Sequence, residues 1–504
     1  MFIRLPRFHR TKGLLFLIAG VLAVASCTAP GRSTGNAGGD TGSGGSTGGN
    51  GSGGGVGPTG GATGGGGNAS AGSGGAGAGG RVSTGGAGGS VAGTGTGGAG
   101  STGTGGAGAG TGGAGTGTGG GSGGSGSGGA PLTIPGSGQC AAPTGATVAD
   151  ATAAYNKWKS DLVVSDGARG FLRVIRPNSS GAQVDSSNSE GIGYGMLLAV
   201  YANDQNTFDN LWKYEQLFLD NHGLMNWYIS SDGNSVLGTG AATDGDEDMA
   251  FALLMADKRW GGQGSLSTSY LAAAKTQIGL LWQYEVDPNH GYVLTSGDQS
   301  DGSVINISYF APAYYREFGQ ATNAAANWKK VIDECYTVIS ATLNAANGNQ
   351  NNGLVPAWST PAGVPMTPPG TSMPLYHQLD SCRTPFRLGE DYCWNAEPRA
   401  LTYLQKITGF YASVGVATMV DGYDLNGTPH PQFVTTGGPR AASFVGPAGV
   451  GAMATGTTYV KLRDDAYASV ATLTDLAGST YYQESWTALS LQMMTGLLQD
   501  LAAP

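Results

Sequence analysis

The chain has 504 residues, and its composition divides it into two unlike parts. Residues 31–130 hold 52 of the 93 glycines and no Phe, Trp or Tyr, so they lack the apolar surface that offsets the chain entropy lost on folding. Residues 131–504 hold all 9 Trp and all 21 Tyr, with 19 basic and 33 acidic residues and a net charge of −14. This acidic part would repel phosphates, which argues against a nucleic-acid partner.

The first residues predict an export signal. Residues 1–12 carry four basic side chains, and residues 13–25 form an apolar run of 13 residues. A membrane span takes about 20 residues, so this run is too short to be one and is typical of a signal peptide. The run leads into VASC at 24–27, which resembles a bacterial lipobox. We expect residues 1–26 to be a lipoprotein signal peptide and Cys27 to be lipidated; the alternative is an ordinary signal peptide with an incidental cysteine.

Residues 27–130 predict a disordered linker rich in Gly, Ser and Thr. A Gly-rich coil of this length has a root-mean-square span of about 55 Å, which separates a folded domain from a membrane. Its GxGxxG matches follow from composition, because a dinucleotide site needs a strand before the glycines and a helix after them. We expect an exported monomer that is lipid-anchored to the bacterial cell envelope and exposed at the surface.

Helical periodicity dominates residues 131–504, which we interpret as one domain. In residues 325–345 apolar side chains recur at i, i+3, i+4 and i+7. Similar patterns predict helices over 148–163, 190–203, 207–220, 247–258, 267–286, 310–320, 394–412 and 480–501. Long irregular segments, rich in Gly, Asn, Asp, Ser and Pro, separate them at 287–308, 346–393 and 421–450. Strand-like alternation is scarce, so the pattern predicts an all-α domain of ten or more helices.

Four cysteines remain after Cys27, and export would permit three disulfide pairings among them. Cys382 and Cys393 are the closest in sequence, which favours that pair, although the spacing leaves the pairing open. Cys335 falls on the apolar face of a predicted helix and is interpreted as a buried thiol. The sequence around Cys140 does not indicate its disulfide partner.

Metal catalysis is not predicted. The five histidines are far apart in sequence, and HExxH and CxxC motifs are missing. The acidic run at 244–248 fails as an EF-hand loop, because Met249 and Met255 stand where Gly and Glu are required. Residues 131–504 contain no Gly-x-Ser-x-Gly, so serine catalysis has no support. We expect neither a metal nor a cofactor.

Carboxylates beside aromatic residues indicate glycoside hydrolysis, which uses one carboxyl as acid and another as base or nucleophile. Glu190 begins a predicted helix, where it would alternatively complement the helix dipole. Asp244 begins a run of four acids in five residues, for which the alternative is a solvated helical turn. Asp380 lies three residues before Arg383, either as a structural salt bridge or as a base kept ionised by Arg383.

Taken together, these segments resemble family 8 of the glycoside hydrolases over about residues 150–500. The resemblance implies an (α/α)6 barrel with a long open cleft and inversion of anomeric configuration. The matching segments, in chain order, are SEGIGYGMLLAVYANDQNTFDNLW, ATDGDEDMAFALLMADKRWG, NISYFAPAYYREF, GLVPAWST, LDSCRTPFR, ASFVGPAGVGAMATG and YYQESWTALSLQMMTG.

The same resemblance implies roles for individual residues. Glu190 is expected to be the general acid, Asp380 the general base, and Asp244 a hydrogen-bond partner of the sugar at the cleavage point. The residues expected to bind substrate are Trp227, Tyr309, Arg383, Tyr481, Tyr482 and Tyr194.

The chain departs from the family pattern in two places. Gln299-Ser300-Asp301 occupies a stretch where family members carry a Trp that serves as a sugar platform. Cys382 and Phe386 stand where Thr and Trp are expected, which puts the rim of the cleft in question.

We therefore expect an inverting, endo-acting β-1,4-glucanase that cleaves cellulose-type chains. The alternatives are the same mechanism acting on chitosan, xylan or mixed-linkage β-glucan, and a polysaccharide-binding protein without catalysis. A role in digestion and a role in cellulose export both remain open.

Overall fold

The computed structural model describes four stretches of the chain, 132–177, 183–431, 442–472 and 481–503. The predicted signal peptide, Cys27 and the predicted linker lie outside the described residues. Within the described stretches, none of the helices combines the length and the apolar character that a bilayer span requires.

The described residues contain twelve α-helices of two kinds. Six are buried over most of their surface, namely α2 (Ser189–Tyr201), α4 (Thr243–Trp260), α6 (Pro312–Ala321), α8 (Thr384–Asn395), α11 (Ala442–Met453) and α13 (Tyr481–Met494). The other six bury one face, namely α1 (Val148–Leu162), α3 (Gln205–Glu215), α5 (Tyr270–Tyr284), α7 (Ala325–Thr342), α9 (Pro398–Val414) and α12 (Val460–Ala471).

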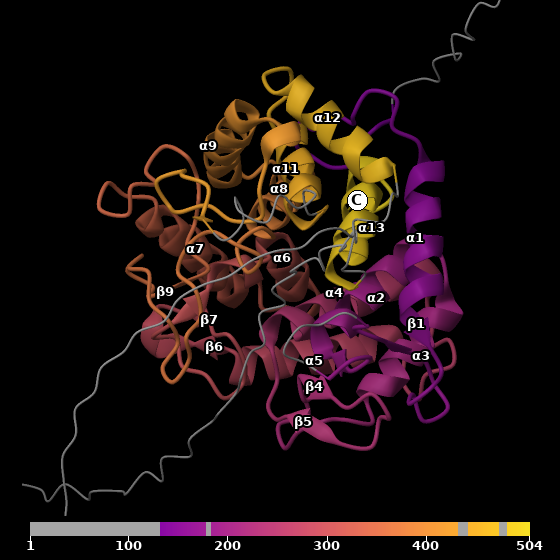
Figure 1. Cartoon of the computed structure of the whole chain (residues 1–504). Helices are drawn as coiled ribbons and strands as arrows, with labels where there is room; N and C mark the ends of the chain where they lie inside the picture. Colours follow the sequence, from indigo (N-terminus) through magenta and orange to yellow (C-terminus); the bar gives the residue numbers. More distant parts are fainter. Residues whose placement is uncertain (1–131, 178–182, 432–441, 473–480, 504) are drawn as a thin grey trace, which may run out of the picture. The chain divides into compact units, whose positions relative to one another are not determined.

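The buried helices form a closed inner ring. Contacts lead from α2 through α4, α6, α8, α11 and α13 back to α2. Each inner helix also packs on one outer helix, and the pairs are α2 with α3, α4 with α5, α6 with α7, α8 with α9, α11 with α12, and α13 with α1. Figure 1 shows the outer helices surrounding the inner ones. The predicted (α/α)6 barrel is confirmed.

Glycines allow α2 and α4 to pack closely. A Cβ atom on Gly193 would lie 2.9 Å from Cβ of Asp248, and one on Gly245 would lie 2.7 Å from the carbonyl carbon of Ser189. Glycine is unfavourable within a helix, and here it allows one backbone to approach another. Gly193 of the SEGIGYG segment and Gly245 of α4 therefore bring the first turns of the two helices together.

Short strands lie beside the first turns of the inner helices. β3 (Ser187–Asn188) leads into α2 and pairs antiparallel with β4 (Tyr228–Ile229), which pairs with β5 (Val236–Gly238). β8 (Ile305–Asn306) leads into a 3-10 turn at Ile307–Tyr309 and pairs with β9 (Trp358–Ser359). The remaining pairs are β1 (Val163–Val164) with β2 (Arg173–Val174) and β6 (Val286–Asp287) with β7 (Val293–Leu294).

Three helices were not predicted. The expected irregular segments 346–393 and 421–450 contain most of α8 and α11, and α12 follows them. The expected helix over 394–412 is two helices, because Ala396 adopts φ +54° and ends α8 before Pro398 begins α9. α11 is buried at every residue and so lacks amphipathic contrast. In α8 the contrast is further hidden by buried charged side chains such as Arg387.

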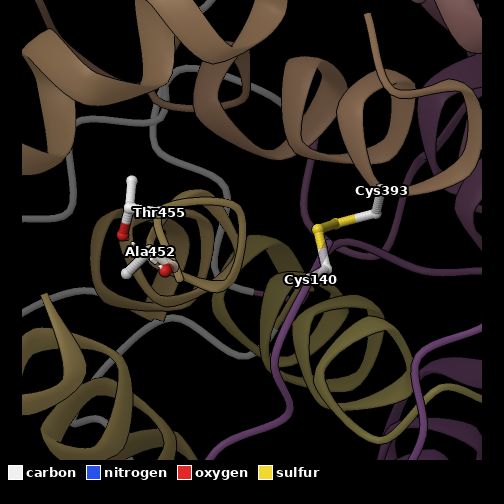
Figure 2. The surroundings of a disulfide bond; sticks show 4 residues. All are labelled: Cys140, Cys393, Ala452 and Thr455. Carbon is white, nitrogen blue, oxygen red and sulfur yellow. Dashed lines mark hydrogen bonds between the residues drawn. A yellow bond between two sulfur atoms is a disulfide. The ribbon is translucent and has the colours of Figure 1, made fainter. Parts of the chain in front are cut away.

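The expected Cys382–Cys393 disulfide is wrong. Cys140 is bonded to Cys393, with their Cα atoms 5.4 Å apart, while Cys335 and Cys382 are buried free thiols in the described part of the chain. Figure 2 shows Cys140, on the segment before α1, bonded to Cys393 on α8. Cys382 precedes α8 and Cys393 lies near its end, so the helix separates them by about 15 Å, beyond the reach of a disulfide.

Candidate active site

The predicted site residues gather where the inner helices begin. Glu190 lies in the first turn of α2, Asp244 in the first turn of α4, and Tyr481 begins α13, while Arg383 directly precedes α8. The unpaired N–H groups at a helix start favour negative charge nearby. This end of the ring is therefore suited to hold carboxylates.

Arg383 joins two of the predicted catalytic carboxylates. Its Nη1 atom donates to Oε2 of Glu190 at 2.9 Å and to Oδ2 of Asp244 at 2.7 Å. The arginine side chain is 1% exposed, against 5% for Asp244 and 18% for Glu190. One buried cation thus serves two carboxylates, and of the two, Glu190 is the more accessible.

The shared cation leaves negative charge uncompensated in the pair. Burial raises the pKa of Asp244 to about 7; Arg383 opposes this shift, and the charges of Glu190 and Asp248 add to it. Asp244 therefore retains its proton close to neutral pH.

Aromatic and hydroxyl side chains also contact Arg383 and hold it in place. Its Nε atom donates to Oγ of Ser308 at 3.0 Å, and its guanidinium lies 4.8 Å from the centre of the Tyr309 ring. The Tyr194 hydroxyl lies 3.2 Å from Nη1, and Tyr194 is fully buried. Tyr194 therefore contacts the arginine beneath the site.

Tyr481 holds the other oxygen of Glu190. Its hydroxyl lies 2.7 Å from Oε1 of Glu190 and 3.1 Å from Oδ1 of Asn188. The Asn188 side chain caps α2 by accepting from the backbone N–H of Gly191 at 3.0 Å. Both oxygens of Glu190 are thus oriented by donors from other inner helices.

Asp380 lies apart from this ion pair. The amide of Gln378 donates to Oδ2 of Asp380 at 3.0 Å, and the backbone N–H of Asp380 donates to Oε1 of Gln378 at 3.1 Å. Burial raises the pKa of Asp380, while the charge of Arg383, Gln378 and the indole of Trp358 oppose the shift. In the described residues Arg383 forms its ion pairs with Glu190 and Asp244, so the alternative of an Asp380–Arg383 salt bridge is wrong.

Trp227 lies between the starts of α2 and α4. Its carbonyl accepts from the backbone N–H of Ser189 at 3.1 Å, and its own N–H donates to the carbonyl of Gly240 at 2.9 Å. The half-buried indole stacks on Tyr228 with ring centres 5.0 Å apart. It also covers Gly238, where a Cβ atom would lie 2.4 Å from Nε1 of Trp227.

The alternative of a solvated turn fails for all the acids of this run. Asp246, Glu247 and Asp248, which follow Asp244, are 0% exposed. Each accepts a hydrogen bond in the core; their respective partners are Gln277, Tyr315 and Arg387.

The family model for "Glycosyl hydrolases family 8" matches residues 139–496 of this chain. The chain belongs to glycosyl hydrolase family 8. It is therefore a glycoside hydrolase of an inverting family, as the sequence predicts.

Named members of family 8 resemble it over most of their length. Endoglucanase C of Ruminiclostridium cellulolyticum is 37% identical over 69% of this chain and 71% of its own. Endoglucanase A of Acetivibrio thermocellus is also 37% identical, over 68% of both chains. The structure of a β-1,3-1,4-glucanase from Paenibacillus sp. X4 is 28% identical, with a TM-score of 0.62, and the match covers 73% of this chain and 96% of that one.

The departures from the family 8 pattern near Asp380 lie behind the site. Cys382 and Phe386 are each 1% exposed, so they do not form a rim. Phe386 packs edge-on against Trp486, with ring centres 5.2 Å apart. The Tyr482 hydroxyl donates to the carbonyl of Leu379 at 2.9 Å, which holds the segment that carries Asp380. These residues therefore support the position of the predicted base.

Trp358 and Gln378 contact the candidate site but were not predicted as site residues. Trp358 is 2% exposed and meets the Tyr309 ring edge-on, with centres 6.5 Å apart. Its indole interacts with the Asp380 carboxylate and opposes the rise in the pKa of Asp380. The GLVPAWST segment, which resembles the family, was the only sequence signal for Trp358. Gln378 lies just outside the LDSCRTPFR segment and had none.

Proposed function

We propose that this chain is an endo-acting β-1,4-glucanase that cleaves cellulose-type chains with inversion. The observation that carries the proposal is the pair Glu190 and Asp244 on one buried arginine, with Asp380 held separately by Gln378. An inverting glycosidase needs a proton donor and a distinct base on water. The two endoglucanases at 37% identity support the substrate class.

Glu190 acts as the general acid in this proposal. It is the more exposed carboxyl of the pair, so it faces the glycosidic oxygen and donates a proton to it. The bond from the anomeric carbon to that oxygen breaks as the proton arrives. Arg383 then balances charge on both carboxylates, and Asp244 is free to hydrogen-bond the sugar at the cleavage point.

Asp380 acts as the general base. A water molecule attacks the anomeric carbon from the opposite face and passes a proton to the Asp380 carboxylate. Inversion requires about 6.5–9.5 Å between the two carboxyl groups, because the water must fit beside the sugar. Gln378 orients Asp380 for this step.

The six residues predicted to bind substrate divide by exposure and contacts. We propose that the half-buried Trp227 contacts a sugar ring directly, because aromatic faces cover the apolar faces of sugars. Tyr309 is 6% exposed and packs against the Arg383 guanidinium, so it acts through Arg383. Tyr194 is fully buried and acts through Arg383. Tyr481 and Tyr482 hold Glu190 and the Asp380 segment at the edge of the substrate path.

The test is release of reducing ends from carboxymethylcellulose by the full chain. Glu190→Gln should lower kcat by about 1000-fold or more and leave the unfolding midpoint unchanged. Glu334→Gln, on outer helix α7, is the matched control and should keep wild-type activity. NMR of the first product should show the inverted anomer. An active Glu190→Gln enzyme would exclude the assignment.

A mixed-linkage β-glucan is the second candidate substrate. The Niallia circulans β-glucanase is 32% identical over 68% of this chain and 83% of its own. Gln299-Ser300-Asp301 also replaces the expected Trp platform. Assays on mixed-linkage glucan, xylan and chitosan beside carboxymethylcellulose decide among these substrates by kcat/KM. Binding without any product would favour a polysaccharide-binding protein.

We further propose that the enzyme is an exported monomer, anchored to the cell envelope through a lipid on Cys27. The basic and apolar start of the chain and the VASC sequence support this. In a bacterial host, labelled fatty acid should enter the wild type and not Cys27→Ala. Equal labelling of both proteins would exclude the anchor. Sedimentation of the Cys27→Ala protein measures whether it is a monomer.

A further inference from the structure

One cluster outside the candidate active site has the composition of a metal site. It comprises Asp220 and His222, in the turn after α3, and Asp298, in the segment between β7 and β8. One ligand atom from each residue lies within 4.8 Å of the others. Nδ1 of His222 is hydrogen-bonded to Oδ2 of Asp298 and lies 3.9 Å from Oδ2 of Asp220.

A buried oxygen in this cluster lacks a partner. Oδ2 of Asp220 accepts no hydrogen bond from the described residues, although the Asp220 side chain is only 4% exposed. The other oxygen, Oδ1, accepts from the backbone N–H groups of His222 at 2.8 Å and Leu224 at 3.1 Å. Asp220 is therefore fixed by one oxygen, while the other faces the imidazole without compensation.

Asp298 is anchored in the same way. Its Oδ1 atom accepts from the backbone N–H of Ala241 at 2.8 Å, and its side chain is fully buried. Each carboxylate thus has one oxygen held by the backbone and one directed at Nδ1 of His222. Two buried carboxylates that converge on one point repel each other unless a proton or a cation lies between them.

We propose that Asp220, His222 and Asp298 bind one divalent transition-metal ion of the Zn²⁺ class. One imidazole nitrogen with two carboxylate oxygens suits Zn²⁺, whereas Ca²⁺ and Mg²⁺ prefer oxygen ligands alone. On binding, the ion replaces the hydrogen bond between His222 and Asp298, and any proton held there is released. The His222 side chain is 27% exposed, so an ion can enter.

The surroundings of the cluster indicate a structural role. The imidazole of His222 stacks on Tyr284, with ring centres 4.1 Å apart, which fixes its orientation. Ala241, the backbone partner of Asp298, lies three residues before Asp244. The ion would therefore connect the turn after α3, the approach to α4 and the segment before β8, and hold the start of the helix that carries Asp244.

The test is Zn²⁺ binding to the full chain after removal of metal with a chelator. Calorimetry should show one saturable Zn²⁺ site per chain, with Ca²⁺ binding more weakly. Zn²⁺ should also raise the unfolding midpoint, because a ligand that binds only the folded state stabilises it. Elemental analysis of the purified, unstripped protein gives the identity of any resident metal.

Variants of the cluster residues test whether Zn²⁺ binds at this cluster or at other side chains of the chain. Asp220→Asn keeps Oδ1 as an acceptor for the backbone, and we expect it to weaken Zn²⁺ binding by about tenfold or more. His222→Gln should do the same. His290→Gln is the matched control, because Nδ1 of His290 pairs with Oδ2 of Asp287 at 2.7 Å on the surface, outside the cluster.

Three results would overturn the proposal. Absence of saturable Zn²⁺ binding would mean that a shared proton fills the place between the carboxyl groups. Equal Zn²⁺ affinity in Asp220→Asn and wild type would place the ion elsewhere. Tighter binding of Ca²⁺ than of Zn²⁺ would exclude the metal class. None of these results depends on hydrolytic activity, so they do not test the proposed function.

Discussion

Two buried arginines, Arg383 and Arg387, stand one helical turn apart at the start of α8. Each pairs with an acid of α4, and these acids, Asp244 and Asp248, are also one turn apart. Each guanidinium lies over a tyrosine ring, 4.8 Å from the centre of Tyr309 for Arg383 and 5.0 Å from the centre of Tyr314 for Arg387. The ring of helices thus contains two layers with nearly the same chemistry.

The two layers differ in the exposure of the other acidic residues that contact the arginine. Arg383 also binds Glu190, which is 18% exposed. Arg387 is surrounded by Asp248 and Glu390, both fully buried. The layer at the helix starts therefore has a carboxyl that solvent reaches, whereas the two acids paired with Arg387 are closed to solvent. A buried charged pair by itself does not indicate catalysis; the exposure of one carboxyl separates the candidate site from the layer beneath it.

Among the variants that separate the two layers, the largest effect is expected from Arg383→Gln, which removes the cation shared by Glu190 and Asp244. The negative charge that develops on Glu190 as it donates its proton then has no fixed positive partner. The kcat on carboxymethylcellulose should therefore fall by about 100-fold or more. Reducing-end release measures the loss, and circular dichroism shows that the fold is kept. Retained turnover would mean that Arg383 is structural, like Arg387.

Arg387→Gln should affect stability instead of turnover. It leaves Asp248 buried without its cation, which should lower the free energy of unfolding by about 3–5 kcal/mol. Denaturant unfolding measures this loss. The double variant Arg387→Gln/Asp248→Asn removes both charges and should recover part of it. A large fall in kcat of the folded Arg387→Gln protein would contradict the division between the layers.

The dependence of kcat/KM on pH is a further test of the layer that contains Arg383. Because burial raises the pKa of Asp244 to about 7, Asp244 holds its proton below that pH and loses it above. We expect kcat/KM to fall up to tenfold per pH unit on the alkaline side of about 7. Asp380 must be ionised to act as base. Because its pKa is raised, the loss of kcat/KM on the acidic side should begin at a pH above the usual pKa range of carboxyl groups.

A variant tests the origin of the alkaline limb. Asp244→Asn removes the carboxyl whose pKa is about 7, so the alkaline limb near that pH should disappear while overall activity falls. An alkaline limb that stays near pH 7 in Asp244→Asn would show that another group titrates there.

The smallest effect is expected at the far end of α8, away from Arg383. Cys140→Ser opens a disulfide that joins residues 253 apart in sequence, which should lower the free energy of unfolding by about 2–4 kcal/mol. The unfolding midpoint measures the change, and activity below that midpoint should be unaltered. Cys335→Ala, at a free buried thiol of α7, is the control and should shift the midpoint less.

The sequence was sufficient for five of the six outer helices, all except α12, and for the family. Outer helices bury one face, so α7 shows its apolar stripe in the spacing of Trp328, Val331, Ile332 and Cys335. The motif segments hold Glu190, Asp244 and Arg383 because each belongs to one local helix start. Periodicity and motif order are local properties, and a single sequence displays them directly.

Tertiary structure decided what depends on distant partners. Inner helices α8 and α11 have no exposed face to create a pattern, so their positions emerged only from the ring. The bond of Cys140 to Cys393, the contact of Arg383 with Glu190 and the convergence of His222 on Asp298 each join residues at least 76 positions apart. Spacing along a chain sets helical faces, but only packing determines which charges meet.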